Sequence, residues 1–192
     1  MRNAKSLQRC ARSGFTVVEL LIVVVVIAVI ATISTVAYAG VQQRAKNTAT
    51  IAQVNQWSKV LAAYKVEKGE YPMSSYSCLG NGIANFSATD GYQQGECQLV
   101  DTSASSYSEA YLGSDIKNTL KNIFVALPDG MGQSVSGRVG SYSIKSRGIL
   151  YEGAMIRYYL LGKDADCKPG VKFTNLGGSS SDTITPCRLE LK

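Results

Sequence analysis

An uncharged apolar segment near the N-terminus constrains this chain more than any other feature. Residues 20–41 include no charged side chain and contain the run LLIVVVVIAVIATI. A helix of that length is about 33 Å long, which is enough to cross the apolar core of a bilayer. A buried helix of a globular protein is rarely apolar on all faces over such a length. We therefore predict a membrane-spanning helix.

A secretory signal peptide is the main alternative for such a segment. Its apolar region usually has about 7–15 residues and ends at a small-residue cleavage site. The segment in this chain is longer, and no such site follows it. Residues 1–14 carry four basic side chains and no acid, whereas two basic residues, Arg44 and Lys46, follow the segment. The positive-inside rule therefore places the N-terminus in the cytoplasm and the rest of the chain outside.

The basic N-terminal residues also account for most of the net charge. The 192 residues carry a formal charge of +6, from 20 Lys+Arg against 14 Asp+Glu. Without the four basic residues of 1–14 the balance is 16 against 14, or +2. Net charge alone therefore gives little support to nucleic-acid binding. The absence of His excludes Ser-His and Cys-His nucleophile pairs and His-ligated metals.

Four of the five cysteines form two evenly spaced pairs. Cys78 and Cys97 are about twenty residues apart, as are Cys167 and Cys187, and each pair flanks a loop rich in Gly and Ser. Four cysteines allow three connectivities, and we favour the sequential one because of these loops. Zinc is the alternative, but the chain has neither a CxxC spacing nor a His to support it. Disulfides indicate an oxidising compartment, in agreement with the expected topology.

Glu19 lies at the edge of the apolar segment. An ionisable side chain there is costly and is by default a candidate for function. The alternative is a carboxylate that only contacts lipid headgroups. If the chain is cleaved after Gly14, the new amino group of Phe15 becomes a counter-charge for Glu19. Within one helix that amine points away from Glu19, so we expect the pair to form between neighbouring copies.

The residues around this position resemble a known processing signal. Arg-Ser-Gly14 is followed by FTVVELLIV, with Glu19 five residues after Gly14. This pattern resembles the class III leader and N-terminal helix of type IV pilins and type II secretion pseudopilins. The resemblance implies that a membrane aspartic peptidase cleaves between Gly14 and Phe15 and methylates Phe15. It also implies that Glu19 pairs with a neighbour's N-terminus during filament assembly.

The helix is expected to continue beyond the membrane. Apolar residues recur at three- to four-residue spacing as far as Tyr64, and Gly69 and Pro72 then end the pattern. A helix over 15–68 is about 80 Å long, so part of it must lie in a membrane or among other copies. Many type IV pilins carry a helix-breaking Pro at the place of Val36, and without it no break is required there.

The fold class that we expect is α+β and pilin-like. A long N-terminal helix packs, through Trp57, on an antiparallel β-sheet head with disulfide-bounded loops. The expected domains are a removed leader peptide (1–14), the transmembrane and assembly half of the helix (15–39), its amphipathic half (40–68) and a globular head (69–192). The head is expected to contain a loop region (69–114), a short helix (115–125), and a sheet of three to five strands with a C-terminal disulfide loop (140–192).

Two groups of charged side chains in the head are candidate ligand sites. Related pseudopilins bind calcium in the head, which makes three carboxylates weak candidates for metal ligands: Asp164, Asp166 and Asp182. Their order matches no EF-hand spacing, so we expect no metal and no other cofactor. Four basic side chains are candidates for contact with DNA, although a solvated basic face is the simpler interpretation: Lys163, Lys168, Lys172 and Arg188.

The sequence thus predicts a structural pilin subunit and not an enzyme. It would be held in the cytoplasmic membrane and then assembled into a helical filament at the cell surface, for adhesion, twitching motility or DNA uptake. The resemblance implies these partners: copies of itself, other major and minor pilins, the prepilin peptidase, and a membrane assembly platform with its ATPase. The alternatives are a pseudopilin of a type II secretion or competence system, a minor pilin with a ligand-binding head, and a membrane-anchored enzyme or binding module.

Overall fold

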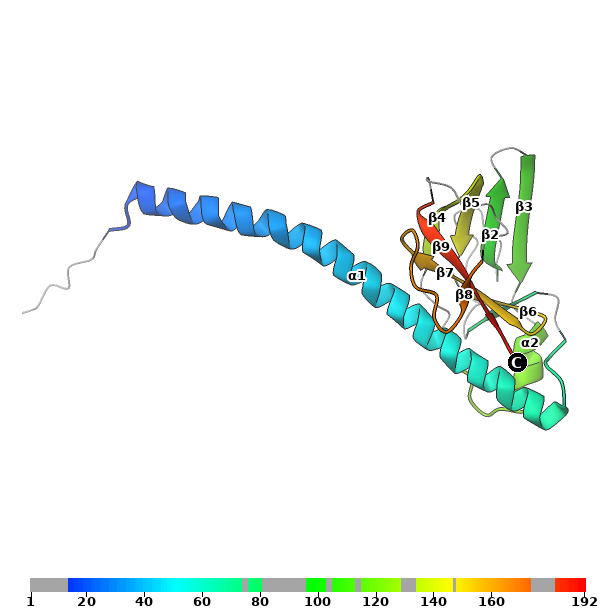
Figure 1. Ribbon diagram of the computed structural model, residues 1–192. Helices are drawn as coiled ribbons and strands as arrows, with labels where there is room; N and C mark the ends of the chain where they lie inside the picture. The colour runs from blue at the N-terminus through cyan, green and yellow to red at the C-terminus, as the bar shows by residue number, and fades with distance from the viewer. Residues whose placement is uncertain are drawn as a thin grey trace, which may run out of the picture. The chain divides into compact units, whose positions relative to one another are not determined.

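The structure is a computed structural model, and it describes residues 14–73, 76–80, 96–102, 105–112, 115–128, 134–146, 148–173 and 182–192. The chain divides into two compact units, residues 1–41 and residues 42–192. Figure 1 gives the element labels used below. The predicted leader, 1–14, lies outside the described residues except for Gly14.

Helix α1 (Val17–Lys68) is close to the predicted helix over 15–68. It continues without interruption past Val36, where no Pro limits the backbone hydrogen bonds. The helix ends at Gly69, which has a φ of 81° and whose N–H donates to the carbonyl oxygen of Lys65 at 2.8 Å. Glycine adopts this left-handed conformation at little cost, which makes it a common residue after the last helical turn.

The 42–192 unit contains two antiparallel sheets and a short helix, α2 (Asp115–Lys121). The five-stranded sheet has the order β1 (Ser77–Leu79), β6 (Ile149–Glu152), β7 (Met155–Leu161), β9 (Ile184–Glu190) and β8 (Val171–Lys172). The four-stranded sheet has the order β3 (Ser105–Leu112), β2 (Glu96–Thr102), β5 (Tyr142–Ser146) and β4 (Val135–Val139).

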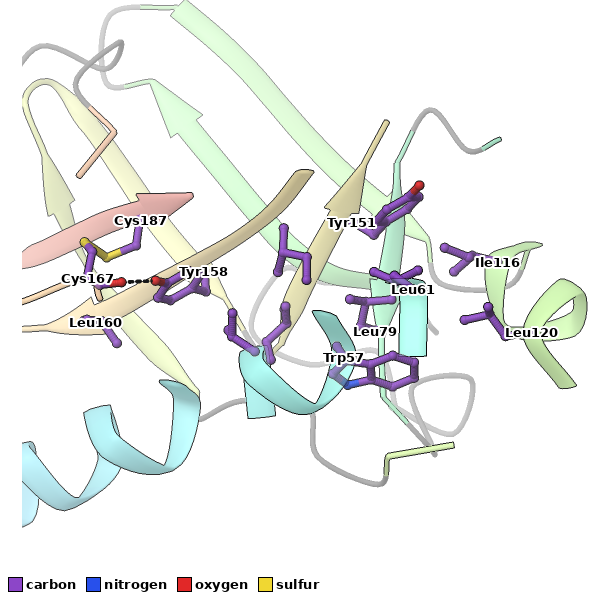
Figure 2. Packing of buried hydrophobic residues seen from close by; sticks show 13 residues of the cluster. Trp57, Leu61, Leu79, Ile116, Leu120, Tyr151, Tyr158, Leu160, Cys167 and Cys187 are labelled. Carbon is purple, nitrogen blue, oxygen red and sulfur yellow. Dashed lines mark hydrogen bonds between the residues drawn. A yellow bond between two sulfur atoms is a disulfide. The ribbon is translucent and has the colours of Figure 1, made fainter. Parts of the chain in front are cut away.

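The main core lies where α1 meets the five-stranded sheet. Val54, Trp57 and Leu61 of α1 are at most 1% exposed, which confirms that Trp57 packs on the head. Figure 2 shows Trp57 and Leu61 near side chains of the strands and of α2, with Ile116 and Leu120 contributed by α2. A second cluster joins residues from both sheets: Val135, Val139, Ile144, Tyr159 and Ile184.

A disulfide and several hydrogen bonds join the two sheets, among them the bond that the side-chain amide of Gln98 in β2 donates to the hydroxyl of Tyr159 in β7 at 3.1 Å. A disulfide links Cys78 of β1 to Cys97 of β2 and therefore connects one sheet to the other covalently. Elsewhere, Arg138 of β4 exchanges two hydrogen bonds with Thr183, which precedes β9, at 2.9 and 3.0 Å. The second disulfide joins Cys187 of β9 to Cys167 in the segment after β7. The structure thus contains the sequential pairing that the sequence favoured.

Three expectations for the head need correction. The region 69–114 is not only a loop, because it contains β1, β2 and β3. Strands β6, β7, β8 and β9 form the antiparallel sheet expected over 140–192, together with β1, whereas β5 belongs to a second sheet with β2, β3 and β4 that was not expected. Strands β1 and β2 pair with β6 and β5, far away in the sequence, and such long-range pairing is not visible in local pattern. Strands β3 and β4 instead pair with their neighbours along the chain, β2 and β5. Helix α2 ends at Lys121 rather than near residue 125, because the N–H groups of Ile123 and Phe124 both donate to Leu120 in a closing turn.

Candidate assembly site and head surface

The predicted processing residues lie just before the N-terminal end of α1, and the predicted assembly residue, Glu19, lies in its first turn. Gly14 and Phe15 lie before the helix and are exposed, Phe15 by 71% of its surface. A Cβ added at Gly14 would meet no other atom within 4 Å among the described residues. The Gly14–Phe15 bond, at which the resemblance implies cleavage, is therefore in an open and non-helical part of this unit.

Thr16 and Glu19 form a reciprocal cap at the start of α1. The carboxylate oxygen Oε2 of Glu19 accepts from the backbone N–H of Thr16 at 2.9 Å and from its hydroxyl at 2.8 Å. The hydroxyl oxygen of Thr16 in turn accepts from the N–H of Glu19 at 3.2 Å. This arrangement is a capping box, which satisfies two N–H groups that have no partner within the helix. A carboxylate in the first turn also interacts favourably with the helix dipole.

The capping box was missed in the sequence, although its signal is present there. The pattern Thr-x-x-Glu immediately before an apolar run indicates such a cap. Glu19 therefore has a role in its own helix, in addition to any role between copies. Within the described residues, the other carboxylate oxygen, Oε1, accepts no hydrogen bond. Glu19 can thus cap its own helix and still offer an acceptor to a second group.

The first part of α1 exposes a continuous apolar surface. Its large apolar side chains from Val17 to Ile33 are between 46% and 81% exposed. Exposed apolar surface of this extent is typical of segments that contact lipid or other proteins. By length and composition, α1 is the one helix among the described residues that could cross a membrane.

The three candidate metal-binding aspartates are each engaged by a donor of the chain itself. Asp164 forms an ion pair with Lys172, which lowers the pKa of its carboxyl group. Asp166 accepts from the backbone N–H of Lys168 at 3.2 Å. Asp182 accepts from the N–H of Gly140 at 2.7 Å. The described part of the chain holds no group of three His, Cys, Asp or Glu side chains placed to bind a metal ion.

The candidate DNA-contacting side chains are also largely paired with acids. Lys168 lies 3.5 Å from Asp166, and Lys172 pairs with Asp164. Arg188 lies 3.1 Å from Glu190, and its guanidinium stacks over the ring of Phe173 at 5.7 Å. Acids that neutralise these cations reduce the field that a phosphate backbone would meet. The arrangement therefore favours a solvated face with ion pairs over a nucleic-acid surface.

Comparison with known proteins identifies one feature of the chain. Residues 9–35 match the family model described as the prokaryotic N-terminal methylation motif. This match covers the leader junction and the first part of α1, and it supports a class III leader of the type IV pilin and pseudopilin kind. Comparisons with curated proteins and with solved structures gave no match. The long helix followed by antiparallel sheets with two disulfides is a pilin-like α+β arrangement.

Proposed function

We propose that this chain is a structural subunit of a type IV pilus-like filament and has no catalytic activity of its own. One observation carries the proposal: the capped carboxylate of Glu19 lies in the first turn of the exposed apolar part of α1, inside the methylation motif. Cleavage after Gly14 leaves Phe15 as the first residue, one position before the helix cap. An apolar surface of this kind is stable in lipid or against the same surface of other copies.

The charge pair between copies sets their axial register. Helices that meet through apolar surfaces gain little from leaving lipid, so apolar contact alone selects no single position. An unpaired carboxylate in the same surroundings is costly. Oε2 of Glu19 is already satisfied by Thr16, and Oε1 accepts a hydrogen bond from the amino group of a neighbouring copy's Phe15. Assembly then favours the position at which this amine and carboxylate meet.

The subunit's location changes with assembly. Before assembly, α1 holds the chain in the cytoplasmic membrane, with the basic leader inside and the head outside. The two disulfides of the head support this orientation, because disulfides persist outside the cytoplasm. After assembly the subunit belongs to a filament at the cell surface. Its partners are further copies and other pilins, with the prepilin peptidase and the assembly platform and its ATPase acting on it.

The substitution Glu19→Gln tests the assembly role separately from the cap. Glutamine keeps a side-chain oxygen that can accept from Thr16, but it carries no charge for a neighbour's amine. We expect a cleaved and folded subunit whose yield in filaments sheared from the cell surface falls by at least about tenfold. Glu19→Ala should lose filaments as well, and the matched control Thr16→Ser should assemble normally because it retains the capping hydroxyl. A normal filament yield from Glu19→Gln would contradict the assembly role.

An intact-mass measurement without reductant tests the processing step. In sheared filaments the chain should lack residues 1–14, should be four hydrogens lighter because of two disulfides, and should carry one added methyl group. A processed chain found only in the membrane fraction would favour a pseudopilin or a minor subunit over a surface pilin. An uncleaved chain in filaments would show that the leader assignment is wrong.

A further inference from the structure

Two side-chain amides of α1 hold the last residue of strand β7. The side chain of Asn47 accepts from the N–H of Leu161 at 2.8 Å and donates to its carbonyl oxygen at 2.9 Å. Gln43, one turn earlier, donates to the same carbonyl at 2.9 Å. Asn47 thereby supplies both the acceptor and the donor that a neighbouring strand would supply. We call these three residues the latch.

The latch forms where β7 extends past its neighbour in the sheet. The pairing with β6 covers only 155–157 of β7, whereas the pairing with β9 continues to Leu161. The N–H and carbonyl groups of Leu161 therefore have no strand on the β6 side among the described residues. Asn47 satisfies them both, because a carboxamide presents one acceptor and one donor side by side.

The part of α1 near the latch meets the head through the hydrogen bonds of Gln43 and Asn47 and without a fully buried apolar side chain. Residues 42–46 are exposed, and the described residues of 42–49 bury no apolar side chain fully. The first buried side chain is Thr50, at 3% exposure, and the apolar anchor of Val54, Trp57 and Leu61 follows. Hydrogen bonds to partly exposed groups contribute little net stability, whereas buried apolar side chains contribute more. Residues 42–49 of α1 are therefore attached to the head less firmly than the stretch that carries Val54, Trp57 and Leu61.

The end of β7 stays in place without the latch. Gly162 donates to the carbonyl oxygen of Thr183 at 3.1 Å, and its own carbonyl accepts from the hydroxyl of Thr185 at 2.7 Å. Gly162 has a φ of 92°, and the position of an added Cβ is occupied by the amide of Gln43. Opening the latch therefore exposes the polar groups of Leu161 to water without unfolding the strand or the helix.

We propose that the latch opens and closes as a local two-state element while the apolar anchor stays packed. Opening frees residues 42–49 of α1 from the head, which is about 12 Å of intact helix. Residues 42–49 are thus held against the head in the closed state and free of it in the open state, while the anchor of Val54, Trp57 and Leu61 is packed in both. This opening is a property of the single subunit, so it can hold or fail independently of the proposed filament function.

Amide hydrogen exchange in the full chain, in detergent micelles, tests the latch residue by residue. The Leu161 amide reports the latch, and the adjacent Gly162 amide reports the strand end. Local opening exposes little surface, so Leu161 should exchange at a rate that barely changes between zero and moderate urea, whereas Gly162 should exchange faster as urea rises. Equal urea dependence of the two amides in the wild type would overturn the proposal.

Variants of the two amide residues sharpen the test. Asn47→Ala should raise the exchange rate of Leu161 about tenfold and leave Gly162 within about twofold. Gln43→Ala removes only a bond to the carbonyl, so Leu161 should change much less. Asn55→Ala, on the same helix but outside the latch, is the control and should change neither rate. If Asn47→Ala accelerates both amides equally, the latch is part of the global structure and the proposal fails.

Discussion

Tyr158 offers a stringent test of how the head is held together. Its side chain is 1% exposed, and its hydroxyl donates to the carbonyl oxygen of Cys167 in the disulfide-bounded segment (Figure 2). The hydroxyl also accepts from the N–H of Gly170. Burial raises the pKa of the phenol to about 12. The substitution Tyr158→Phe removes the hydroxyl and leaves the Cys167 carbonyl buried without this donor.

The pH dependence follows from the direction of the pKa shift. The unfolded phenol loses its proton near pH 10, whereas the folded one keeps it until about pH 12. The stabilising effect of the neutral hydroxyl is therefore complete below pH 10 and is lost as pH rises towards 12. The difference of about two between the folded and unfolded pKa of Tyr158 corresponds to at most about 2.7 kcal/mol of unfolding free energy, of which about 1.4 kcal/mol is lost by pH 11.

The assay compares urea unfolding of the wild-type and Tyr158→Phe chains, in micelles, by circular dichroism at pH 8 and pH 11. At pH 8 we expect Tyr158→Phe to be less stable by about 1–3 kcal/mol, because a buried carbonyl loses its donor. At pH 11 the difference in unfolding free energy should shrink by about 1.4 kcal/mol. Other tyrosines and lysines titrate in both chains and cancel in the comparison. A difference that stays constant between the two pH values would refute the reasoning.

Two further substitutions probe the backbone of the head. Gly137→Ala places a Cβ 2.5 Å from the Cγ2 atom of Ile184, which is 2% exposed. We expect the free energy of unfolding in urea to fall by about 1–3 kcal/mol, and Ile184→Leu, which removes that methyl group, to restore part of it. No recovery would mean that another contact is responsible. Ala154 has a φ of 66° in the turn between β6 and β7, so Ala154→Gly should stabilise the head by about 0.5 kcal/mol. The control Ala62→Gly, on the exposed face of α1, should destabilise it by about 1 kcal/mol. A loss of stability at both positions would contradict the assigned turn.

The sequence by itself determined the N-terminal part of this protein and the covalent links of its head. Helix α1 was predictable because its uncharged run, its periodicity and the terminating Gly69 are local along the chain. The disulfide partners were predictable because each pair brackets one loop. The cap of Thr16 and Glu19 is equally local, because the two residues are three positions apart and form the pattern Thr-x-x-Glu.

Only the tertiary structure decided the second sheet and the latch. Strand β2 pairs with β5, so that Gln98 lies opposite Ser146, and the Ser- and Tyr-rich sequences of this region do not indicate such distant partners. Asn47 and Leu161 are likewise 114 residues apart. On a helix surface, Asn47 is indistinguishable in sequence from any solvated polar residue. Its role arises because β7 extends beyond its pairing with β6. The N–H and carbonyl groups of Leu161 then need a donor and an acceptor from the nearby helix.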